Sequence, residues 1–296
     1  MSETALLSVR GLAKRYGRVR ALRGLDLTVG AGEVYGFLGR NGAGKSTTIR
    51  ILMGITKPDA GEVRLFGEPT KGAHVRVRQR IGYVAQEQTF YDWMTAKRLA
   101  RFVSRFYPTW DQSTFERLCA AQAVPLDRKV GTFSGGMRVK LALALALGPR
   151  PPLLILDEPT AGLDPVARRE FLERVREDAE RTGRTTFFST HLIDEVELVA
   201  DRVGIVDDGR TRYEGTVDAL AARVRLFAGE PPPDLALPEG VRPVSDRTFR
   251  GRRRLVFEAP DPTAFAALEA RLGAPLSRLP LEEIFIEMVR REPTGV

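Results

Sequence analysis

The sequence predicts an α/β protein with a mostly parallel core sheet, an N-terminal antiparallel β subdomain, a helical subdomain and a small C-terminal α+β module. Three observations predict this class. A short apolar strand runs into a glycine-rich turn and then a helix over 33–54. Two further apolar runs, 153–156 and 185–189, have the character of strands buried in a parallel sheet. A proline-rich stretch over 229–240 marks a change in amino-acid composition along the chain.

The first 220 or so residues alternate between strands and amphipathic helices. Residues 7–29 alternate in polarity and break at Gly17 and Gly30, which predicts an antiparallel pair of strands. Later strands are expected over 33–38, 81–84, 153–156 and 185–189. Helices are expected over 47–54, in segments of 95–126 broken at prolines, over 137–147 and over 165–180.

The residues after about 220 differ in composition from those before them. The stretch from Gly229 to Gly240 is a proline-rich connector. A strand is expected over 254–258, and helices over 263–272 and 281–291. We therefore predict one domain over 1–222 and an accessory or dimerisation module over 223–296.

Composition narrows the class of protein. A hydrophobic fraction of 43% with 28% charged residues excludes wholesale disorder and fibrous folds. The net charge of +8 indicates a polyanionic partner: nucleic acid, an acidic membrane or a nucleotide. Cys119 is the only cysteine, so no intrachain disulfide forms and a reducing compartment is favoured. The longest strongly apolar stretch, 141–148, is far short of the roughly 20 residues of a membrane-spanning helix.

The glycine-rich turn matches the phosphate-binding loop (P-loop) pattern in full, as Gly39-Arg-Asn-Gly-Ala-Gly-Lys45-Ser46. Its glycines let backbone N–H groups converge on phosphate oxygens at a helix N-terminus. We expect Lys45 to reach the β and γ phosphates and Ser46 to ligate Mg²⁺. The alternative is a glycine-rich turn with an incidental lysine. The expected nucleotide contacts are Gly39, Asn41, Gly42, Ala43, Gly44, Lys45, Ser46 and Thr47.

Two carboxylates end the apolar run 153–156. Asp157 is placed to hold Mg²⁺, directly or through water. Glu158 is then free to orient or deprotonate an attacking water. Taken alone the pattern is weak, because strands often end in acidic turns.

A second candidate anion site opens the helix near residue 137. Ser134 can cap that helix, and Gly135 and Gly136 leave its first N–H groups bare. The plain alternative is an ordinary helix cap. Two helix N-termini that can each bind phosphate, far apart in the sequence of one chain, indicate a nucleotide shared between two chains.

Together these motifs resemble the ATP-binding cassette (ABC) family, with Walker A at 39–46, the signature at 134–137 and Walker B at 153–158. Four lesser motifs follow the family's order, so that the resemblance covers about residues 5–220. Gln86 matches the Q-loop, Asp164 the D-loop and His191 the switch histidine, while Tyr16 matches the aromatic that stacks on adenine. Three of them also have a plain reading: Gln86 as a solvent-facing loop residue, His191 as a satisfied structural residue and Tyr16 as an ordinary strand aromatic.

The resemblance implies the P-loop NTPase fold of ABC ATPases, with ATP and Mg²⁺ as cofactors. It implies catalytic roles for Glu158, His191 and Gln86, and metal contacts from Ser46, Gln86 and Asp157. Tyr16, Ser134, Gly135, Gly136 and Asp164 would join the P-loop in contacting nucleotide. Three residues depart from common family usage without removing the anion sites: Arg40, Phe133 and Met137.

The family also implies partners. A homodimer or heterodimer of cassettes would drive a separate transmembrane permease subunit at the cytoplasmic face of the cell membrane. The Ser-Gly-Gly-Met signature, the segments 91–95 and 106–111, and the tail 281–289 resemble exporters of drugs, peptides or lipid-like molecules. The alternatives are a soluble ABC-type ATPase acting on DNA or ribosomes, which usually has two cassettes or a coiled-coil insertion, and a regulatory or immunity ATPase. About seven of the eight surplus charges lie in the cassette itself, which suits a surface that faces the membrane subunit and its lipids, so we do not expect nucleic acid as a partner.

Overall fold

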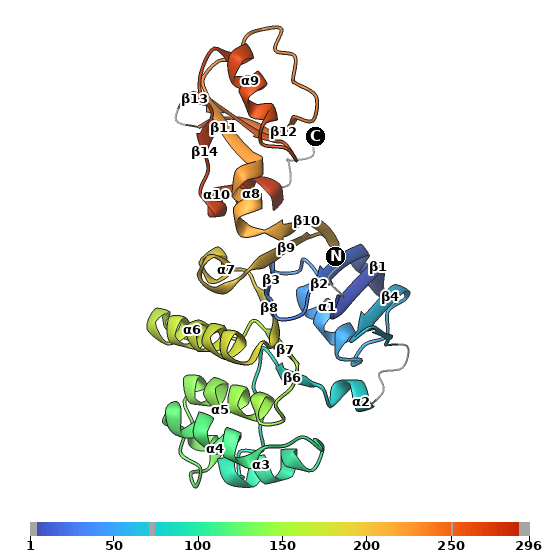
Figure 1. Ribbon diagram of the computed structural model, residues 1–296, viewed down its shortest axis with the longest axis vertical. Coiled ribbons are helices and arrows are strands. Elements are labelled where there is room, and N and C mark those ends of the chain that lie inside the picture. Colours follow the sequence, from blue (N-terminus) through green and yellow to red (C-terminus); the bar gives the residue numbers. More distant parts are fainter. Residues whose placement is uncertain (1–4, 71–74, 250, 290–296) are drawn as a thin grey trace. The chain divides into compact units, whose positions relative to one another are not determined.

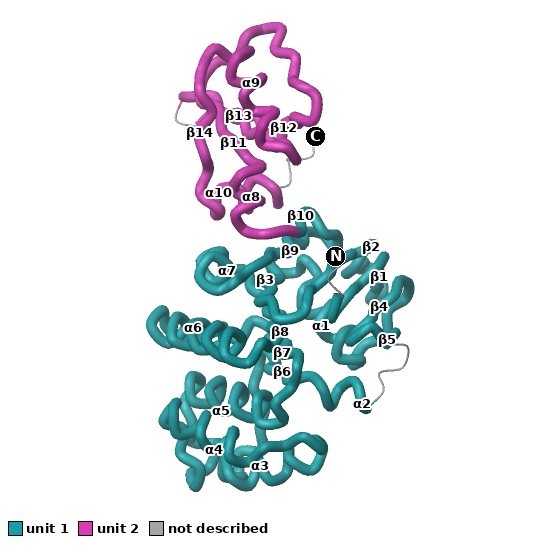
Figure 2. The backbone as a smooth tube through the Cα atoms, in the orientation of Figure 1, with its two compact units in different colours: residues 1–214 teal, residues 215–296 magenta. Residues whose placement is uncertain are grey.

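The computed structural model describes residues 5–70, 75–249 and 251–289. The chain forms two compact units, residues 1–214 and 215–296 (Figure 2). The predicted boundary after residue 222 falls eight residues beyond the end of the first unit, at the end of a helix that belongs to the second.

The first unit begins with an antiparallel sheet of order β2-β1-β4-β5 within the described residues (Figure 1). Its strands are β1 (Leu7–Tyr16), β2 (Val19–Val29), β4 (Ala60–Leu65) and β5 (Glu68–Pro69). The expected pairing of β1 with β2 is confirmed, in a register that sets Leu7 opposite Val29. β4 and β5 were not expected from the sequence, because these short strands alternate weakly in polarity and carry charges.

The central sheet of this unit has the order β10-β9-β3-β8-β7-β6 in the part of the chain that is described. Its strands are β3 (Val34–Gly39), β6 (Ile81–Val84), β7 (Leu153–Asp157), β8 (Thr185–Thr190), β9 (Arg202–Asp207) and β10 (Arg210–Thr216). The pairs β9·β3, β3·β8, β8·β7 and β7·β6 are parallel. Every residue of β3, β7 and β8 is buried, which explains why these strands read as continuous apolar runs. The mostly parallel core sheet is confirmed.

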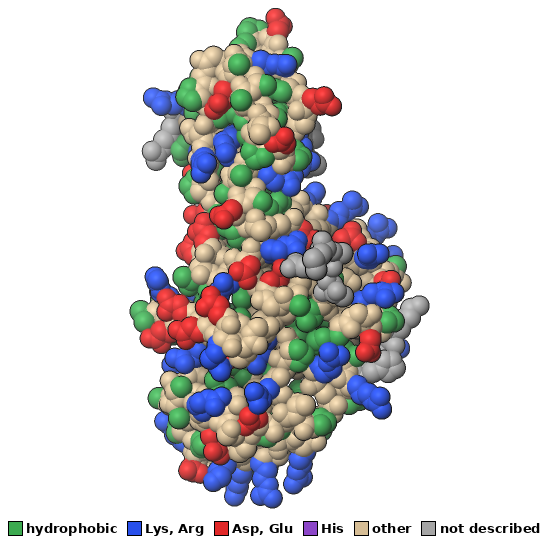
Figure 3. Space-filling view, in the orientation of Figure 1, with side chains coloured by type: hydrophobic (Ala, Val, Ile, Leu, Met, Phe, Trp, Pro, Cys, Tyr) green, Lys and Arg blue, Asp and Glu red, His purple; other side chains and the backbone are tan. Residues whose placement is uncertain are grey.

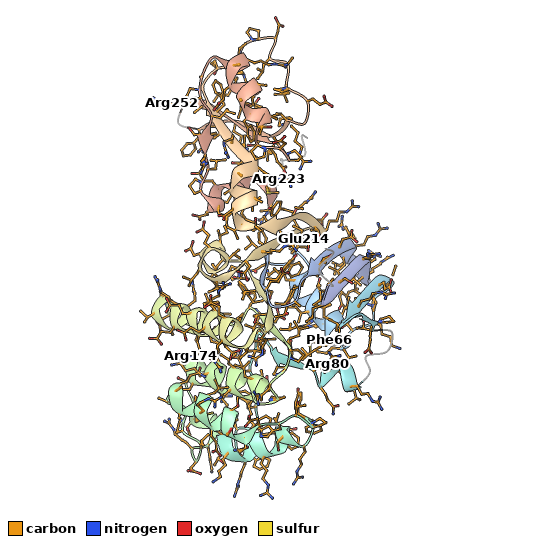
Figure 4. The ribbon with its side chains drawn as sticks, in the orientation of Figure 1. Phe66, Arg80, Arg174, Glu214, Arg223 and Arg252 are labelled. Atoms are coloured by element: carbon orange, nitrogen blue, oxygen red, sulfur yellow. The ribbon has the colours of Figure 1, made fainter. Side chains whose placement is uncertain are left out.

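The helices of the first unit are α1 (Lys45–Leu52), α2 (Val75–Arg78), α3 (Ala96–Ser104), α4 (Gln112–Ala121), α5 (Gly135–Leu147), α6 (Pro165–Thr182) and α7 (Ile193–Val199). α3, α4 and α5 share an apolar core of their own and form the helical subdomain (Figure 1). α1 and α5 each begin two residues before the predicted start, because Gly44 and Ser134 are their N-caps. Near α2, the Arg80 guanidinium lies 3.8 Å from the ring centre of Phe66 (Figure 4).

The second unit is an α+β module, as expected. It contains α8 (Val217–Arg223), β11 (Val224–Ala228), β12 (Arg242–Phe249), β13 (Arg252–Glu258), α9 (Ala264–Leu272), β14 (Ser277–Arg278) and α10 (Leu281–Val289). Its described strands pair antiparallel in the order β12-β13-β11-β14. The proline-rich stretch joins β11 to β12, so it lies inside this unit, and its Leu235 and Leu237 pack on the module's core. Residues 290 and 291 of the last predicted helix lie outside the described residues.

Across the described ranges, no helix combines the length and the apolar character that crossing a bilayer requires.

Candidate functional site

The loop between β3 and α1 is shaped by two glycines. An added Cβ at Gly39 would lie 2.6 Å from the backbone oxygen of Val206 on β9. At Gly44 it would lie 2.7 Å from Cδ2 of Leu22 on β2, and φ there is 111°, a value that glycine adopts without strain. The loop is therefore held between β9 and β2. The first N–H groups of α1 have no intrahelical acceptors and are free to bind an anion.

Lys45 crosses this loop as a buried cation, 4% exposed. Its Nζ donates to the backbone oxygens of Gly39, at 2.7 Å, and Arg40, at 3.2 Å. It also lies 3.1 Å from Oε1 of Glu158. The ammonium group is thus neutralised by a carboxylate from the end of β7 in this structure.

Asp157 faces two hydroxyl groups. Ser46 Oγ donates to its Oδ1 at 3.2 Å, and Ser189 Oγ from β8 donates to the same oxygen at 2.8 Å. Burial raises the pKa of Asp157, and these hydrogen bonds partly oppose the increase. Because Mg²⁺ takes hard oxygen ligands, often one or two carboxylates together with phosphate oxygens, Ser46 and Asp157 fit a magnesium site beside the P-loop.

Glu158 lies between a lysine and a histidine. Its Oε2 is 3.3 Å from Nδ1 of His191, whose side chain is 41% exposed, while its Oε1 faces Lys45. Its backbone has φ 43°, in the left-handed region that costs energy for a residue other than glycine. The backbone N–H of Glu158 donates to Ser189 Oγ at 3.0 Å, which helps to hold that conformation.

One buried carboxylate that contacts the segments of Glu158 and His191 was not predicted from the sequence. Glu195 on α7 is 2% exposed. Its Oε1 accepts from Thr160 Oγ1 at 2.5 Å and its Oε2 from Thr190 Oγ1 at 2.6 Å, with Nε of Arg168 3.6 Å away. Thr190 precedes His191, and Thr160 lies two residues after Glu158, so Glu195 fastens together the two segments that carry these residues. The only signal in the sequence was an acidic helix after the histidine.

The second predicted anion site lies at the start of α5. Ser134 Oγ accepts from the backbone N–H of Met137 at 3.3 Å, which confirms the expected cap. A Cβ added at Gly135 would meet nothing within 4 Å, and at Gly136 only Leu163 at 3.7 Å. Within the described residues, no hydrogen bond or ion pair joins Ser134–Gly136 to the P-loop.

Three other predicted site residues form no hydrogen bond or ion pair with Lys45, Asp157 or Glu158 in the part of the chain that the structure describes. Gln86 follows β6 as an exposed residue, and Tyr16 ends β1 with 45% of its side chain exposed. Asp164 Oδ1 accepts from the N–H groups of Val166 and Ala167, both at 3.0 Å, and so caps α6. The roles of Gln86, Tyr16 and Asp164 in nucleotide binding therefore stay predictions.

A P-loop lysine, a serine–aspartate pair and a glutamate, gathered at the carboxyl ends of two parallel strands, β3 and β7, that flank β8, define a P-loop nucleoside triphosphatase. A family model described as "ABC transporter" matches residues 22–161. The chain is 34% identical to Nod factor export ATP-binding protein I of Burkholderia lata, over 97% of this chain and 98% of that protein. It is 35% identical to bacitracin transport ATP-binding protein BcrA of Bacillus licheniformis, over 76% and 74%.

Among solved structures, the ATP-binding subunit of an ABC transporter superposes with a TM-score of 0.66 at 30% identity, covering 73% of this chain and 91% of that one. A dimeric ATP-binding cassette bound to ADP and phosphate has a TM-score of 0.65 at 23% identity, over 71% and 98%, and supports the fold alone. The chain belongs to the ABC transporter family. It is an ATP-binding subunit that hydrolyses ATP with Mg²⁺ to drive transport, and such subunits dimerise and act with transmembrane components.

Proposed function

We propose that this chain powers export by a separate transmembrane subunit, closing on ATP as a head-to-tail dimer. One observation carries the proposal: the chain has two helix N-termini suited to phosphate, at Lys45 and at Gly135, and no hydrogen bond or ion pair joins them within the described residues. The P-loop of one subunit and Ser134-Gly135-Gly136 of the other would then complete one nucleotide site. ATP joins the two surfaces and its hydrolysis separates them, which gives a transporter its two states.

Lys45, Ser46, Asp157 and Glu158 supply the chemistry. Lys45 would exchange its carboxylate partner for the β and γ phosphates. Ser46 and Asp157, with Gln86, would hold Mg²⁺, which when bound neutralises charge on the phosphates. Glu158, freed from Lys45, would accept a proton from the attacking water.

The remaining predicted contacts complete the nucleotide site. His191, on a segment tied down through Glu195, would contact the γ-phosphate and respond to its loss. Tyr16 would stack on adenine, and Asp164 would approach the nucleotide from the partner's side. The second subunit is another copy or a related cassette.

The transported molecule is proposed from relatives and from the surface. The relatives are named for Nod factor export and bacitracin transport, which supports an amphipathic drug, peptide or lipid-like substrate. Exposed aromatic side chains lie in a row between Gln86 and Trp110: Tyr91 packs edge-on against Phe102 at 5.9 Å, and Phe102 against Phe106 at 5.3 Å. We assign this aromatic row to the cytoplasmic helices of the transmembrane subunit, which places the chain at the cytoplasmic face of the membrane.

Mixing two inactive variants tests the shared site. Lys45→Ala removes the phosphate-binding cation, and Gly135→Asp sets a negative charge where the partner's nucleotide would lie, at a position with open space for a side chain. A mixed dimer contains one intact site, built from the P-loop of one variant and the signature of the other. With random pairing the mixture should recover up to about one quarter of the parental ATPase activity. A mixture no more active than its components would contradict the shared site.

Transport itself is tested in inverted membrane vesicles that contain the co-purifying transmembrane subunit. ATP-dependent accumulation of a fluorescent amphipathic drug should require parental Glu158, with Glu158→Gln as the matched inactive control. ATP hydrolysis without accumulation of drug, peptide or lipid probes would favour a regulatory ATPase instead.

A further inference from the structure

An open pocket of about 680 Å³ lies on the helical subdomain, and its lining includes none of Lys45, Asp157 and Glu158. Its walls come from α3 and the residues just before it, from the start of α4 and from the segment between α4 and α5. Trp93, 62% exposed, stands at its edge, next to Tyr91 of the aromatic row. In Figure 3 Lys and Arg side chains project from the end of the first unit where Figure 1 places α3.

The pocket is strongly cationic. Its lining includes Lys97, Arg98, Arg101 and Lys129, against a single carboxylate, Asp127. None of these four cations forms an ion pair with any residue of the described ranges, although the chain forms many ion pairs elsewhere. Because like charges repel, four unpaired cations around one hollow are a cost to the folded chain that an anionic ligand would remove.

The walls of the pocket are fixed by the backbone. The N–H of Lys97 donates to the carbonyl of Leu126 at 2.9 Å, and Thr95 pairs with Lys129 in an isolated β-bridge. Thr95 Oγ1 also accepts from the N–H of Arg98 at 3.2 Å and so caps α3. The two cationic segments therefore face the hollow before any ligand arrives, which lowers the entropic cost of binding.

We propose that this pocket binds the headgroup of an anionic phospholipid. A phosphodiester supplies the charge that the lysines and arginines lack, and an exposed tryptophan beside basic residues is typical of side chains that settle at a membrane interface. The pocket adjoins the aromatic row that we assign to contact with the transmembrane subunit. When that subunit binds the aromatic row, the pocket would lie against the inner leaflet of the membrane. The choice of lipid thus rests on the proposed function, but the binding itself can be measured on the chain without that subunit.

Vesicle flotation with the full chain tests the proposal. The chain should float with vesicles of phosphatidylcholine containing about one third phosphatidylglycerol and stay unbound with phosphatidylcholine alone. The double variant Lys97→Gln/Arg101→Gln should bind on the order of thirtyfold more weakly. The matched control, Arg252→Gln/Arg278→Gln, removes two exposed cations of the second unit that form no ion pair with a described residue, and it should bind within about threefold of the parent. Figure 4 labels Arg252.

Tryptophan emission locates the contact, since the chain has only Trp93 and Trp110. Emission should shift to shorter wavelength on binding, and Trp93→Phe should abolish the shift. Equal losses in the pocket and control variants would overturn the proposal, as would equal binding to uncharged vesicles. Glycerol phosphate that protects Lys97 from amine labelling, in a chain that does not float with anionic vesicles, would instead show a soluble phosphate site. An oligonucleotide that displaces vesicles at equal charge concentration would show a nucleic-acid site. Each of these last two outcomes overturns the lipid proposal while leaving the ATPase roles intact.

Discussion

Replacing Glu158 by glutamine tests the centre of the site, because it removes one negative charge and keeps the shape of the side chain. The parental carboxylate lies 3.1 Å from Lys45 Nζ and 3.3 Å from His191 Nδ1. Loss of a general base lowers a rate by about two to four powers of ten, so we expect kcat for ATP hydrolysis to fall by that amount. Phosphate release under saturating Mg·ATP measures it.

The affinity of Glu158→Gln for ATP, unlike its rate of hydrolysis, should not fall. In the parent an incoming phosphate must displace the carboxylate from Lys45, whereas the neutral amide competes less. Glu158→Gln should therefore bind ATP at least as tightly as the parent and accumulate an ATP-bound dimer on gel filtration. Without nucleotide its free energy of unfolding should be lower by about 1–3 kcal/mol, since the buried lysine loses its charged partner.

The matched control is Glu170→Gln, the same chemical change on the exposed face of α6, where the described residues offer no ion-pair partner. It should leave the rate, the affinity and the stability as they are. A parental hydrolysis rate in Glu158→Gln would refute the assignment of the base, and weaker ATP binding would refute the competition with Lys45.

Three further predictions concern the same unit. Lys45→Ala should lose nucleotide affinity itself, by about tenfold or more in a titration with a fluorescent ATP analogue, because a charge-assisted contact to phosphate disappears. Ser189→Ala removes a hydrogen bond that lowers the pKa of Asp157. A carboxyl with a raised pKa stabilises the folded apo chain below its ordinary pKa, and this stabilisation is lost as pH rises through the raised value. In Ser189→Ala the pKa of Asp157 should rise further. The pH at which this stabilisation is lost and the acid limb of Mg²⁺-dependent ATPase activity should therefore both move to higher pH. An acid limb unchanged from the parent would contradict this. Burial raises the pKa of the Cys119 thiol to about 12. The folded chain should therefore react with iodoacetamide at pH 8 on the order of a thousandfold more slowly than the urea-unfolded chain, as mass spectrometry can measure.

The parts of the site that the sequence predicts well are local. The P-loop glycines, Ser46 and the strand-end pair Asp157 and Glu158 belong to short patterns whose geometry follows from a strand, a turn and a helix. The cap by Ser134 is local in the same sense, since donor and acceptor are three residues apart.

The pairings between these patterns could not be predicted. The contact of Glu158 with Lys45 depends on the strand order β3-β8-β7, which no periodicity specifies. Glu195 was missed because its partners, Thr160 and Thr190, come from two separate loops and form no pattern with it. β9 and β10 escaped prediction because they carry charged residues at their ends and follow one another across a short turn.

The position of β3 in its sheet has a consequence for how the chain is made. The strand that leads into the P-loop pairs on one side with Thr185–Thr190 and on the other with Arg202–Asp207. During synthesis from the N-terminus, β3 must therefore wait for both neighbours while about 150 residues emerge, with its apolar side chains unprotected. The nascent helical subdomain can acquire its own core earlier, from contacts close in sequence. Nucleotide-binding competence should thus appear late and abruptly on the ribosome, once residue 207 has cleared the exit tunnel.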